Sequence, residues 1–276
     1  MTGGASGGEE AAASAAARLG PLTDDAFLGG RLAILQPRHG LRAGLDAVML
    51  AAAVPAPASG PFHLLEAGAG TGVAALAVAA RIATAEVAGI EIDGDLVALA
   101  SQNARRNGLA PRARFVEGDV CRGAASLAAE GLMPGSFDHV VANPPYLTAG
   151  AGRTSPDPRR DRAIAMAPGD LGRWARFLAA MAASGGGLTL IHRADRLAEI
   201  LDALEGRFGA LAVRPLYPRE GMPATRILVS GRRDSRAPLA ILPGLVLHRP
   251  EGGFTARAEA ILRAGQGLDP QEQALP

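Results

Sequence analysis

Three glycines, Gly68, Gly70 and Gly72, directly follow an apolar run that reads as a strand, residues 62–67. Glycine permits positive φ angles in a tight turn and lets a ligand approach the backbone closely. The helix expected after the turn would present its amino terminus to the same ligand. A dinucleotide fingerprint would need its third glycine at the position of Val73, so a nicotinamide or flavin enzyme is the weaker interpretation.

Acidic residues mark the ends of the next two predicted strands. Glu91 lies at the end of residues 85–92, about twenty residues beyond the glycines, where a carboxylate can accept hydrogen bonds from both ribose hydroxyls. Asp119 follows residues 113–118 and is placed to accept from an adenine amino group. Helix capping is the alternative, and it fits Asp93 better than Glu91. Glycine-rich and acidic strand ends in register predict a nucleoside-binding crevice.

A second stretch with chemical potential, Asn143-Pro144-Pro145-Tyr146, follows the apolar run 137–142. Two consecutive prolines fix two φ angles and remove two amide donors. A residue that precedes a proline is pushed into an extended conformation. The stretch is therefore a rigid turn, either a proline-stiffened strand exit or a device that holds reacting groups still.

On these motifs, residues 62–233 resemble the class I S-adenosylmethionine-dependent methyltransferases. The resemblance implies that the three glycines wrap the methionine part of the cofactor, while Glu91 holds the ribose and Asp119 the adenine. Glu66 stands where that superfamily more often has Asp, near the methionine amino group. The cofactor-binding residues implied in this way are Glu66, Gly68, Gly70, Gly72, Glu91, Asp119 and Asn143.

The rigid turn resembles the Asp/Asn/Ser-Pro-Pro-aromatic motif of amino methyltransferases that act on adenine N6, cytosine N4 or glutamine N5. A planar NH₂ group is a poor nucleophile because its lone pair is delocalised. The resemblance implies that the Asn143 side-chain oxygen and the Pro144 carbonyl each accept one N–H, which favours the tetrahedral nitrogen that develops during attack. Pro145 stiffens the turn, and Tyr146 offers a ring face on which a flipped base could stack.

Residues 23–52, 218–233 and 243–255 resemble the bacterial tRNA1(Val) adenine-N6 methyltransferase family, which implies tRNA as the partner. The motif alone does not separate adenine from glutamine. A protein glutamine-N5 methyltransferase acting on a release factor or ribosomal protein is the alternative, although such enzymes usually carry a larger helical domain before the glycines. A non-catalytic cofactor-binding module, acting as an RNA-binding or assembly factor, is a second alternative that has no need of the intact motif.

All 28 basic residues are arginine, which excludes Schiff-base chemistry and a lysine-bearing phosphate loop. A net charge of +1 does not indicate a polycationic coat. Local contacts to RNA phosphates are nevertheless plausible from the N-terminal hairpin and from the loop after the rigid turn. The candidate substrate-binding residues are Arg38, Arg42, Arg153, Arg159 and Arg160. A solvated flexible loop is the alternative reading of each.

From residue 62 onward, short apolar runs alternate with segments of helical period. This pattern predicts an α/β fold with a doubly wound, mostly parallel seven-stranded sheet of the Rossmann-like type. An antiparallel strand is expected near the C-terminal edge. The predicted strands are 62–67, 85–92, 113–118, 137–142, 186–193, 211–218 and 224–233. The predicted helices are 72–82, 94–108, a segment around Trp174, 195–206 and a short final helix from residue 254, with one more edge strand within 237–253.

Four regions are expected along the chain. Residues 1–20 have a low-complexity composition that predicts a disordered tail. Residues 21–60 form an N-terminal extension, in which 27–44 predict two short strands around a Pro/Gly turn and 45–54 a helix. The methyltransferase domain is expected over 61–264 and a flexible tail over 265–276.

The remaining expectations concern the setting of the protein. No apolar run reaches the roughly 18 residues that a membrane span requires. Cys121 is the single cysteine, so the sequence offers neither an internal disulfide nor a cysteine-based zinc site. We therefore expect a cytoplasmic, metal-free monomer that acts away from membranes.

Overall fold

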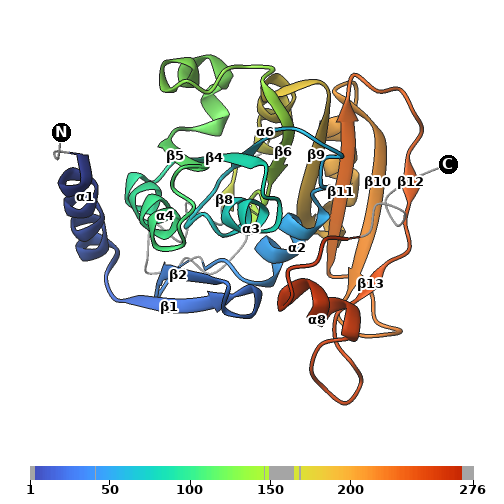
Figure 1. Ribbon diagram of the computed structural model, residues 1–276. Helices are drawn as coiled ribbons and strands as arrows, with labels where there is room; N and C mark the ends of the chain where they lie inside the picture. The colour runs from blue at the N-terminus through green and yellow to red at the C-terminus, as the bar shows by residue number, and fades with distance from the viewer. Residues whose placement is uncertain (1–3, 41, 146, 149–164, 168, 269–276) are drawn as a thin grey trace.

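The computed structural model describes residues 4–40, 42–145, 147–148, 165–167 and 169–268. A nine-stranded sheet forms its centre, in the order β12-β10-β11-β9-β6-β3-β4-β5 with β13 beside β10 (Figure 1). The strands are β3 (Phe62–Ala67), β4 (Ala85–Glu91), β5 (Ala113–Glu117), β6 (Phe137–Ala142), β9 (Ala182–Arg193), β10 (Phe208–Tyr217), β11 (Arg226–Arg233), β12 (Ala240–Ile241) and β13 (Leu245–Val246). Two further short strands, β7 (Leu147–Thr148) and β8 (Ala165–Met166), pair with each other after the rigid turn.

The direction of the strands confirms the predicted doubly wound architecture. β5, β4, β3, β6 and β9 are parallel to one another, and β11 lies antiparallel between β9 and β10. The sheet exceeds the predicted seven strands because two short strands, β12 and β13, pair in parallel with β10 at its outer edge. The carboxyl ends of the central parallel strands therefore meet at one edge of the sheet, where α/β folds bind ligands.

Helices cover both faces of this sheet. One face carries α2 (Leu45–Ala53), α3 (Val73–Arg81), α4 (Gly94–Arg106) and α8 (Ala256–Leu262), and the other carries α6 (Asp170–Met181) and α7 (Leu197–Leu204). Leu64 and Leu65 of β3 show why both layers are needed. Both are fully buried, yet they belong to different core clusters because successive side chains of a strand point to opposite faces.

The N-terminal extension is a hairpin of β1 (Leu22–Phe27) and β2 (Leu32–Pro37), which packs beside α3 and α4. Its turn is the segment η1 (Leu28–Gly30), where Gly29 has a φ of 67°. The prediction of two strands within residues 27–44 therefore placed the hairpin too late in the chain. The predicted turn was formed by the Pro/Gly residues after β2, whereas the observed turn uses the glycines after Phe27, which supply the positive φ angles.

The segment 1–20, expected to be a disordered tail, contains a helix, α1 (Gly4–Leu19), that lies against α4 (Figure 1). Ala12 and Ala15 are buried in that contact, and Arg18 forms an ion pair of 2.6 Å with Asp95 of α4. Alanine is the strongest helix former, and its small side chain allows close packing. The alanine-rich, low-complexity composition of the segment therefore belongs to a helix that packs through a few small side chains.

Two other expectations need correction. Between β5 and β6 the chain forms two 3₁₀ segments, η2 (Val120–Arg122) and η3 (Ala124–Glu130), that were not predicted. Residues 265–268, expected to belong to a flexible tail, pack against the domain: Leu268 is buried and its N–H donates to the carbonyl of Ala52 at 2.8 Å. Among the described residues, no helix is both long and apolar enough to cross a membrane.

Candidate active site

A cavity of about 720 Å³ lies at the carboxyl ends of β3, β4, β5 and β6, a size typical of ligand sites. Its wall on one side is the segment 42–47 at the start of α2, and on the other side it includes Trp174 of α6. The predicted site residues that line it are Arg42, Glu66, Gly68, Gly70, Glu91, Asp119, Asn143, Pro144 and Pro145. The structure therefore brings together both motifs singled out in the sequence.

The three glycines after β3 all have positive φ angles, but they serve different ends. A Cβ at Gly70 would meet no atom within 4 Å, so the backbone there is open to a ligand. A Cβ at Gly68 would lie 2.7 Å from the ring of Trp174. Gly72 does not line the cavity, and a Cβ there would lie 2.8 Å from the ring of Phe115. Gly72 is needed for packing and for the start of α3.

Glu91 braces the glycine turn from the end of β4. Its carboxylate accepts the N–H of Gly70 at 2.8 Å and the N–H of Asp93 at 3.1 Å. Burial raises the pKa of Glu91, while these backbone donors act in the opposite direction. A carboxylate fixed in this way on the cavity wall is preorganised to accept further hydrogen bonds from a bound ligand.

Glu66, at the end of β3, is almost completely buried. Its carboxyl group accepts the N–H of Ala75, in the first turn of α3, at 2.8 Å. Burial raises the pKa of Glu66 to about 8, with a smaller contribution from the charge of Glu91, so the group is protonated at neutral pH. A cationic ligand group beside it would favour the ionised form. No local pattern in the sequence indicates this shift in pKa, because it depends on tertiary burial.

Asp119 lines the cavity next to Cys121. Its carboxylate accepts the N–H of Cys121 at 2.8 Å and so caps the short segment η2. Burial and the nearby carboxylates of Asp170 and Asp119 raise the pKa of the Cys121 thiol. A raised pKa keeps the thiol protonated, which agrees with an inert cysteine.

The rigid turn follows β6 directly, with Pro144 buried and Asn143 and Pro145 partly exposed to the cavity. Tyr146, the last residue of the motif, lies outside the described residues. His192, near the end of the adjacent strand β9, is buried, which lowers its pKa, whereas hydrogen bonding at Pro145 acts in the opposite direction. Sequence reasoning missed His192, since only the β6–β9 register, with Ala142 opposite Leu190, places it level with the turn.

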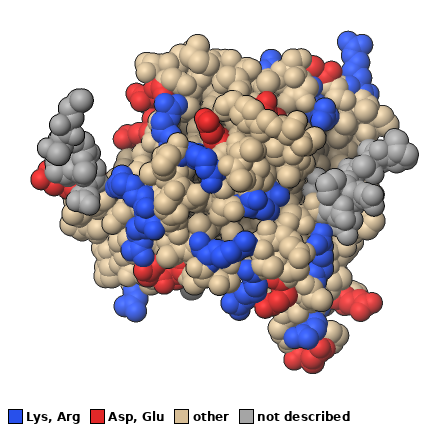
Figure 2. All heavy atoms as spheres, in the orientation of Figure 1, with Lys and Arg blue, Asp and Glu red and all other residues tan. Residues whose placement is uncertain are grey.

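Three arginines line the cavity, and each is paired with an aspartate. Arg226 of β11 binds Asp46 at 2.9 Å, and Arg173 of α6 binds Asp170 at 2.7 Å. The third arginine, Arg42, is the one of the three that the sequence analysis named as a candidate substrate-binding residue. Asp46 lies in the first turn of α2 and lines the cavity, as Arg226 does. Figure 2 shows arginines and acidic residues scattered over one face of the molecule, most of which is formed by other residues.

Arg42 is the predicted substrate-binding residue that lines the cavity, and it binds Asp25 at 2.5 Å. Arg38 is exposed on the hairpin and does not line the cavity. The other three candidates, Arg153, Arg159 and Arg160, lie outside the described residues. The roles assigned to these arginines therefore stay predictions.

An open, mostly parallel sheet with its cavity at the ends of the central strands is the architecture of a Rossmann-like methyltransferase. Residues 64–151 match the family described as "Methyltransferase domain". The crystal structure of a predicted O-methyltransferase from Agrobacterium tumefaciens superposes with a TM-score of 0.67 at 31% identity, covering 81% of this chain and 98% of the other. The chain belongs to the family of class I S-adenosylmethionine-dependent methyltransferases.

Curated relatives point to two acceptors. A release factor glutamine methyltransferase of Deinococcus radiodurans is 36% identical over 146 residues, which is 51% of this chain and 49% of that protein. A tRNA1(Val) (adenine(37)-N6)-methyltransferase of Porphyromonas gingivalis is 35% identical over 126 residues, 45% of this chain and 48% of that protein. The chain spans about half the length of these relatives.

Proposed function

We propose that this protein transfers the methyl group of S-adenosylmethionine to the N6 amino group of an adenine in tRNA. The observation that carries the proposal is the meeting of the glycine turn and the Asn143-Pro144-Pro145 turn on one cavity. A site for a nucleoside cofactor and a rigid turn with two candidate acceptor oxygens therefore share one space. This juxtaposition suits the methylation of a weakly nucleophilic NH₂ group.

The cavity fits the family's cofactor. The backbone at Gly70 is open to a ligand, and carboxylates stand at three neighbouring strand ends, on Glu66, Glu91 and Asp119. In this proposal Glu66 faces the cationic amino group, Glu91 accepts from the ribose hydroxyls and Asp119 accepts from the adenine amino group. S-adenosylmethionine supplies an electrophilic methyl group on its sulfonium.

The chain's own contribution to the reaction lies in the rigid turn. The Asn143 side-chain oxygen and the Pro144 carbonyl each accept one N–H of the acceptor amine. They hold its nitrogen toward the part of the cavity lined by the glycine turn, where the cofactor is proposed to bind. These contacts strengthen as the nitrogen becomes tetrahedral and positively charged, so they favour the transition state over the planar ground state. Pro144 is buried, beside a small void that Trp174 and Ala175 also line, and its fixed φ angle limits the movement of its carbonyl.

Adenine is preferred to glutamine because of the three cavity arginines. Arg42, Arg173 and Arg226 come from three different segments, and their side chains retain 34, 50 and 30% of their exposure. Arginine forks suit phosphate oxygens, and a nucleotide inserted into the cavity brings phosphates with it. A glutamine side chain carries no such charge. Each paired aspartate orients its arginine and limits the net positive field.

The two acceptors can be separated in one experiment. The protein is incubated with S-adenosylmethionine labelled in the methyl group and, in separate reactions, unmodified tRNA, ribosomal RNA and release factors. Products are digested and identified by mass spectrometry, with Asn143→Ala as the inactive control. We expect N6-methyladenine in tRNA. Label that appears only in protein would replace this proposal with glutamine-N5 methylation, and label in no substrate would contradict amino methyl transfer to all three acceptor classes.

A further inference from the structure

The side-chain amide of Gln36 is an unusual feature of the N-terminal hairpin. Gln36 lies on β2 and is 1% exposed, yet it is polar. Its oxygen accepts the N–H of Ala43 at 2.8 Å, and its nitrogen donates to the Ala43 carbonyl at 3.2 Å and to the Asp25 carboxylate at 2.9 Å. One buried amide therefore satisfies both backbone groups of Ala43, a residue of the cavity wall.

The same amide oxygen also reaches the glycine turn. The hydroxyl of Thr71 donates to it at 3.5 Å, and Thr71 is a buried residue that lines the cavity between Gly70 and Gly72. Gln36 thus contacts two parts of the cavity lining, the wall before α2 and the turn after β3. These parts are joined through a hairpin that itself contributes no strand residue to the lining.

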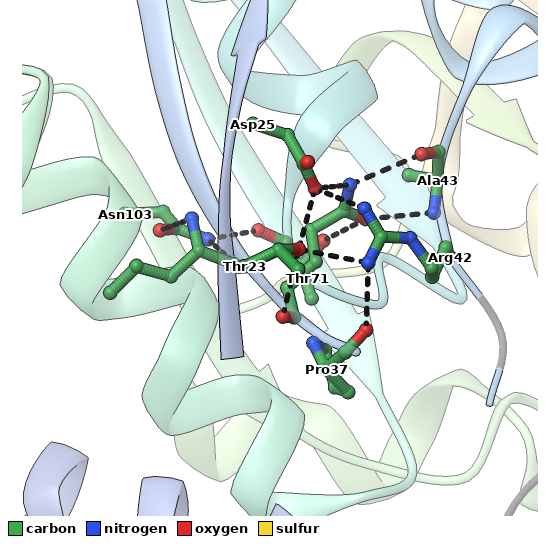
Figure 3. Close-up of polar contacts among 9 residues, drawn as sticks. Thr23, Asp25, Pro37, Arg42, Ala43, Thr71 and Asn103 are labelled. Carbon is green, nitrogen blue, oxygen red and sulfur yellow. Dashed lines mark hydrogen bonds and ion pairs between the residues drawn. The ribbon is translucent and has the colours of Figure 1, made fainter. Parts of the chain in front are cut away.

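Further polar contacts hold this junction (Figure 3). Asp25 accepts from Arg42 at 2.5 Å and from Thr23 at 3.0 Å, so the residue before Ala43 is bound to β1. Asn103 of α4 is fully buried and donates to the Thr71 carbonyl and to the Leu35 carbonyl, each at 3.0 Å. Hairpin, helix, wall and glycine turn therefore form one hydrogen-bonded unit.

We propose that Gln36 is a positioning residue for the cofactor cavity, one that fixes the wall segment 42–47 relative to the glycine turn. The hydrogen bonds of a fully satisfied buried amide offset the cost of its desolvation, and its removal would leave the N–H and carbonyl of Ala43 without these partners in a water-poor place. The wall would then move away, and the cavity would lose the spacing that its ligand needs. The inference rests on the proposed function only for the identity of the cofactor.

Binding and hairpin stability should then be coupled. If Gln36 transmits the position of the wall to the hairpin, cofactor binding must stabilise residues 32–37 by the amount that the intact hairpin favours cofactor binding. We expect amide hydrogen exchange in β2 to slow when S-adenosylhomocysteine is added to the wild-type protein. In Gln36→Leu the protection of β2 should no longer respond to the ligand.

Asn107 offers a matched control on the same hairpin. Its amide also holds both backbone groups of one residue, since it accepts the N–H of Ala33 and donates to the Ala33 carbonyl, each at 2.9 Å. Asn107 lies at the end of α4 and does not line the cavity. A variant at Asn107 therefore removes a comparable hairpin contact without touching the wall.

The experiment compares Gln36→Leu with Asn107→Leu by titration calorimetry with S-adenosylhomocysteine and by thermal unfolding. Both variants should melt earlier than the wild type, since each loses buried hydrogen bonds. We expect the Kd of Gln36→Leu to rise by about tenfold and that of Asn107→Leu to stay within about twofold. Equal affinities in the two variants would overturn the proposal, because the amide would then be a structural contact only.

A second variant keeps the test decisive if Gln36→Leu does not fold. Gln36→Glu retains an oxygen for the Ala43 N–H but, when ionised, faces the Asp25 carboxylate without a proton to donate. Its Kd for S-adenosylhomocysteine should rise above those of the wild type and of Asn107→Leu. A Kd equal to that of Asn107→Leu contradicts the proposal. A wild-type protein that binds no cofactor would instead contradict the proposed function.

Discussion

The two halves of the cavity are built in different ways. The proposed cofactor half comes from consecutive strand ends, and its carboxylates are bound to the chain's own amides, as with Glu91 on Gly70 and the buried Glu66 on Ala75. The proposed acceptor half joins one rigid turn to arginines from distant segments, such as Arg226, which binds Asp46 from 180 residues away in the sequence. Binding should therefore be coupled to protons in the first half and to salt in the second.

The largest effect is expected at the turn of the acceptor half. Asn143→Ala removes one of the two oxygens proposed to hold the acceptor amine, and the loss of one such preorganised group costs about 10²–10³-fold in kcat. Single-turnover methyl transfer to tRNA and calorimetry with the cofactor measure the two halves separately. Cofactor affinity should stay within about threefold, because Asn143 is proposed to act on the acceptor amine.

Two outcomes sharpen this test. Asn143→Asp keeps a side-chain oxygen and should recover part of the activity that Asn143→Ala loses. If cofactor binding collapses in Asn143→Ala, the residue maintains the shape of the cavity and the division into two halves fails at this point.

The next effect belongs to the cofactor half. Glu91→Ala removes the carboxylate proposed for the ribose and should weaken cofactor binding by roughly 1–3 kcal/mol. Glu117 is a matched control, because it pairs directly with Glu91 across the sheet but does not line the cavity. Calorimetry should show Glu117→Ala close to the wild type. Unchanged affinity in Glu91→Ala would move the ribose contact elsewhere, most simply to Asp93.

Glu66 provides a prediction on pH. Its pKa of about 8 in the folded protein lies above the ordinary 4.5, so the protonated group stabilises the fold fully below pH 4.5 and this contribution is lost as the pH rises toward 8. Glu66→Gln, which stays neutral, should gain thermal stability relative to the wild type as the pH rises from about 5 to about 8. Thermal unfolding across that range measures the difference.

Cofactor binding should show the opposite trend at the same residue. A cationic amino group favours ionised Glu66, so the wild-type affinity should rise by up to about tenfold per pH unit below the pKa, while Glu66→Gln should show a flatter profile. Parallel profiles for the two proteins would mean that Glu66 does not face the cation.

The same contrast between the halves explains what the sequence could predict. Glu91, Asp119 and the 143–145 turn follow apolar strand runs directly, so local pattern is enough to place them at one edge of a parallel sheet. The stacking of Trp174 over Gly68, by contrast, depends on how α6 packs, and no periodicity reports it. Strand order likewise decides which residue of β9 stands beside the turn.

The errors in the N-terminal region have a related cause. β1 contains Asp24 and Asp25, and these consecutive polar residues interrupt the alternation of apolar and polar side chains that indicates a strand. Two glycine-containing segments could also each have formed the turn of the hairpin. Gln36 looked like an ordinary polar residue of a strand because its partners, Ala43 and Thr71, are contacts of the folded state. Burial of a polar side chain can only be recognised once its partners are known.

The smallest effect is expected at the mouth of the acceptor half. Arg173→Ala removes an exposed arginine already paired with Asp170, so tRNA binding should weaken only about two- to fivefold at low salt, and the salt dependence should lose about one unit of slope. Arg207 is the control, since its guanidinium binds the Ala203 and Glu205 carbonyls near the start of β10, away from the cavity lining. Equal salt slopes for wild type, Arg173→Ala and Arg207→Ala would mean that Arg173 makes no phosphate contact. The argument for a nucleotide over a glutamine side chain would then fail, because the remaining features of the acceptor half suit the NH₂ group of either acceptor.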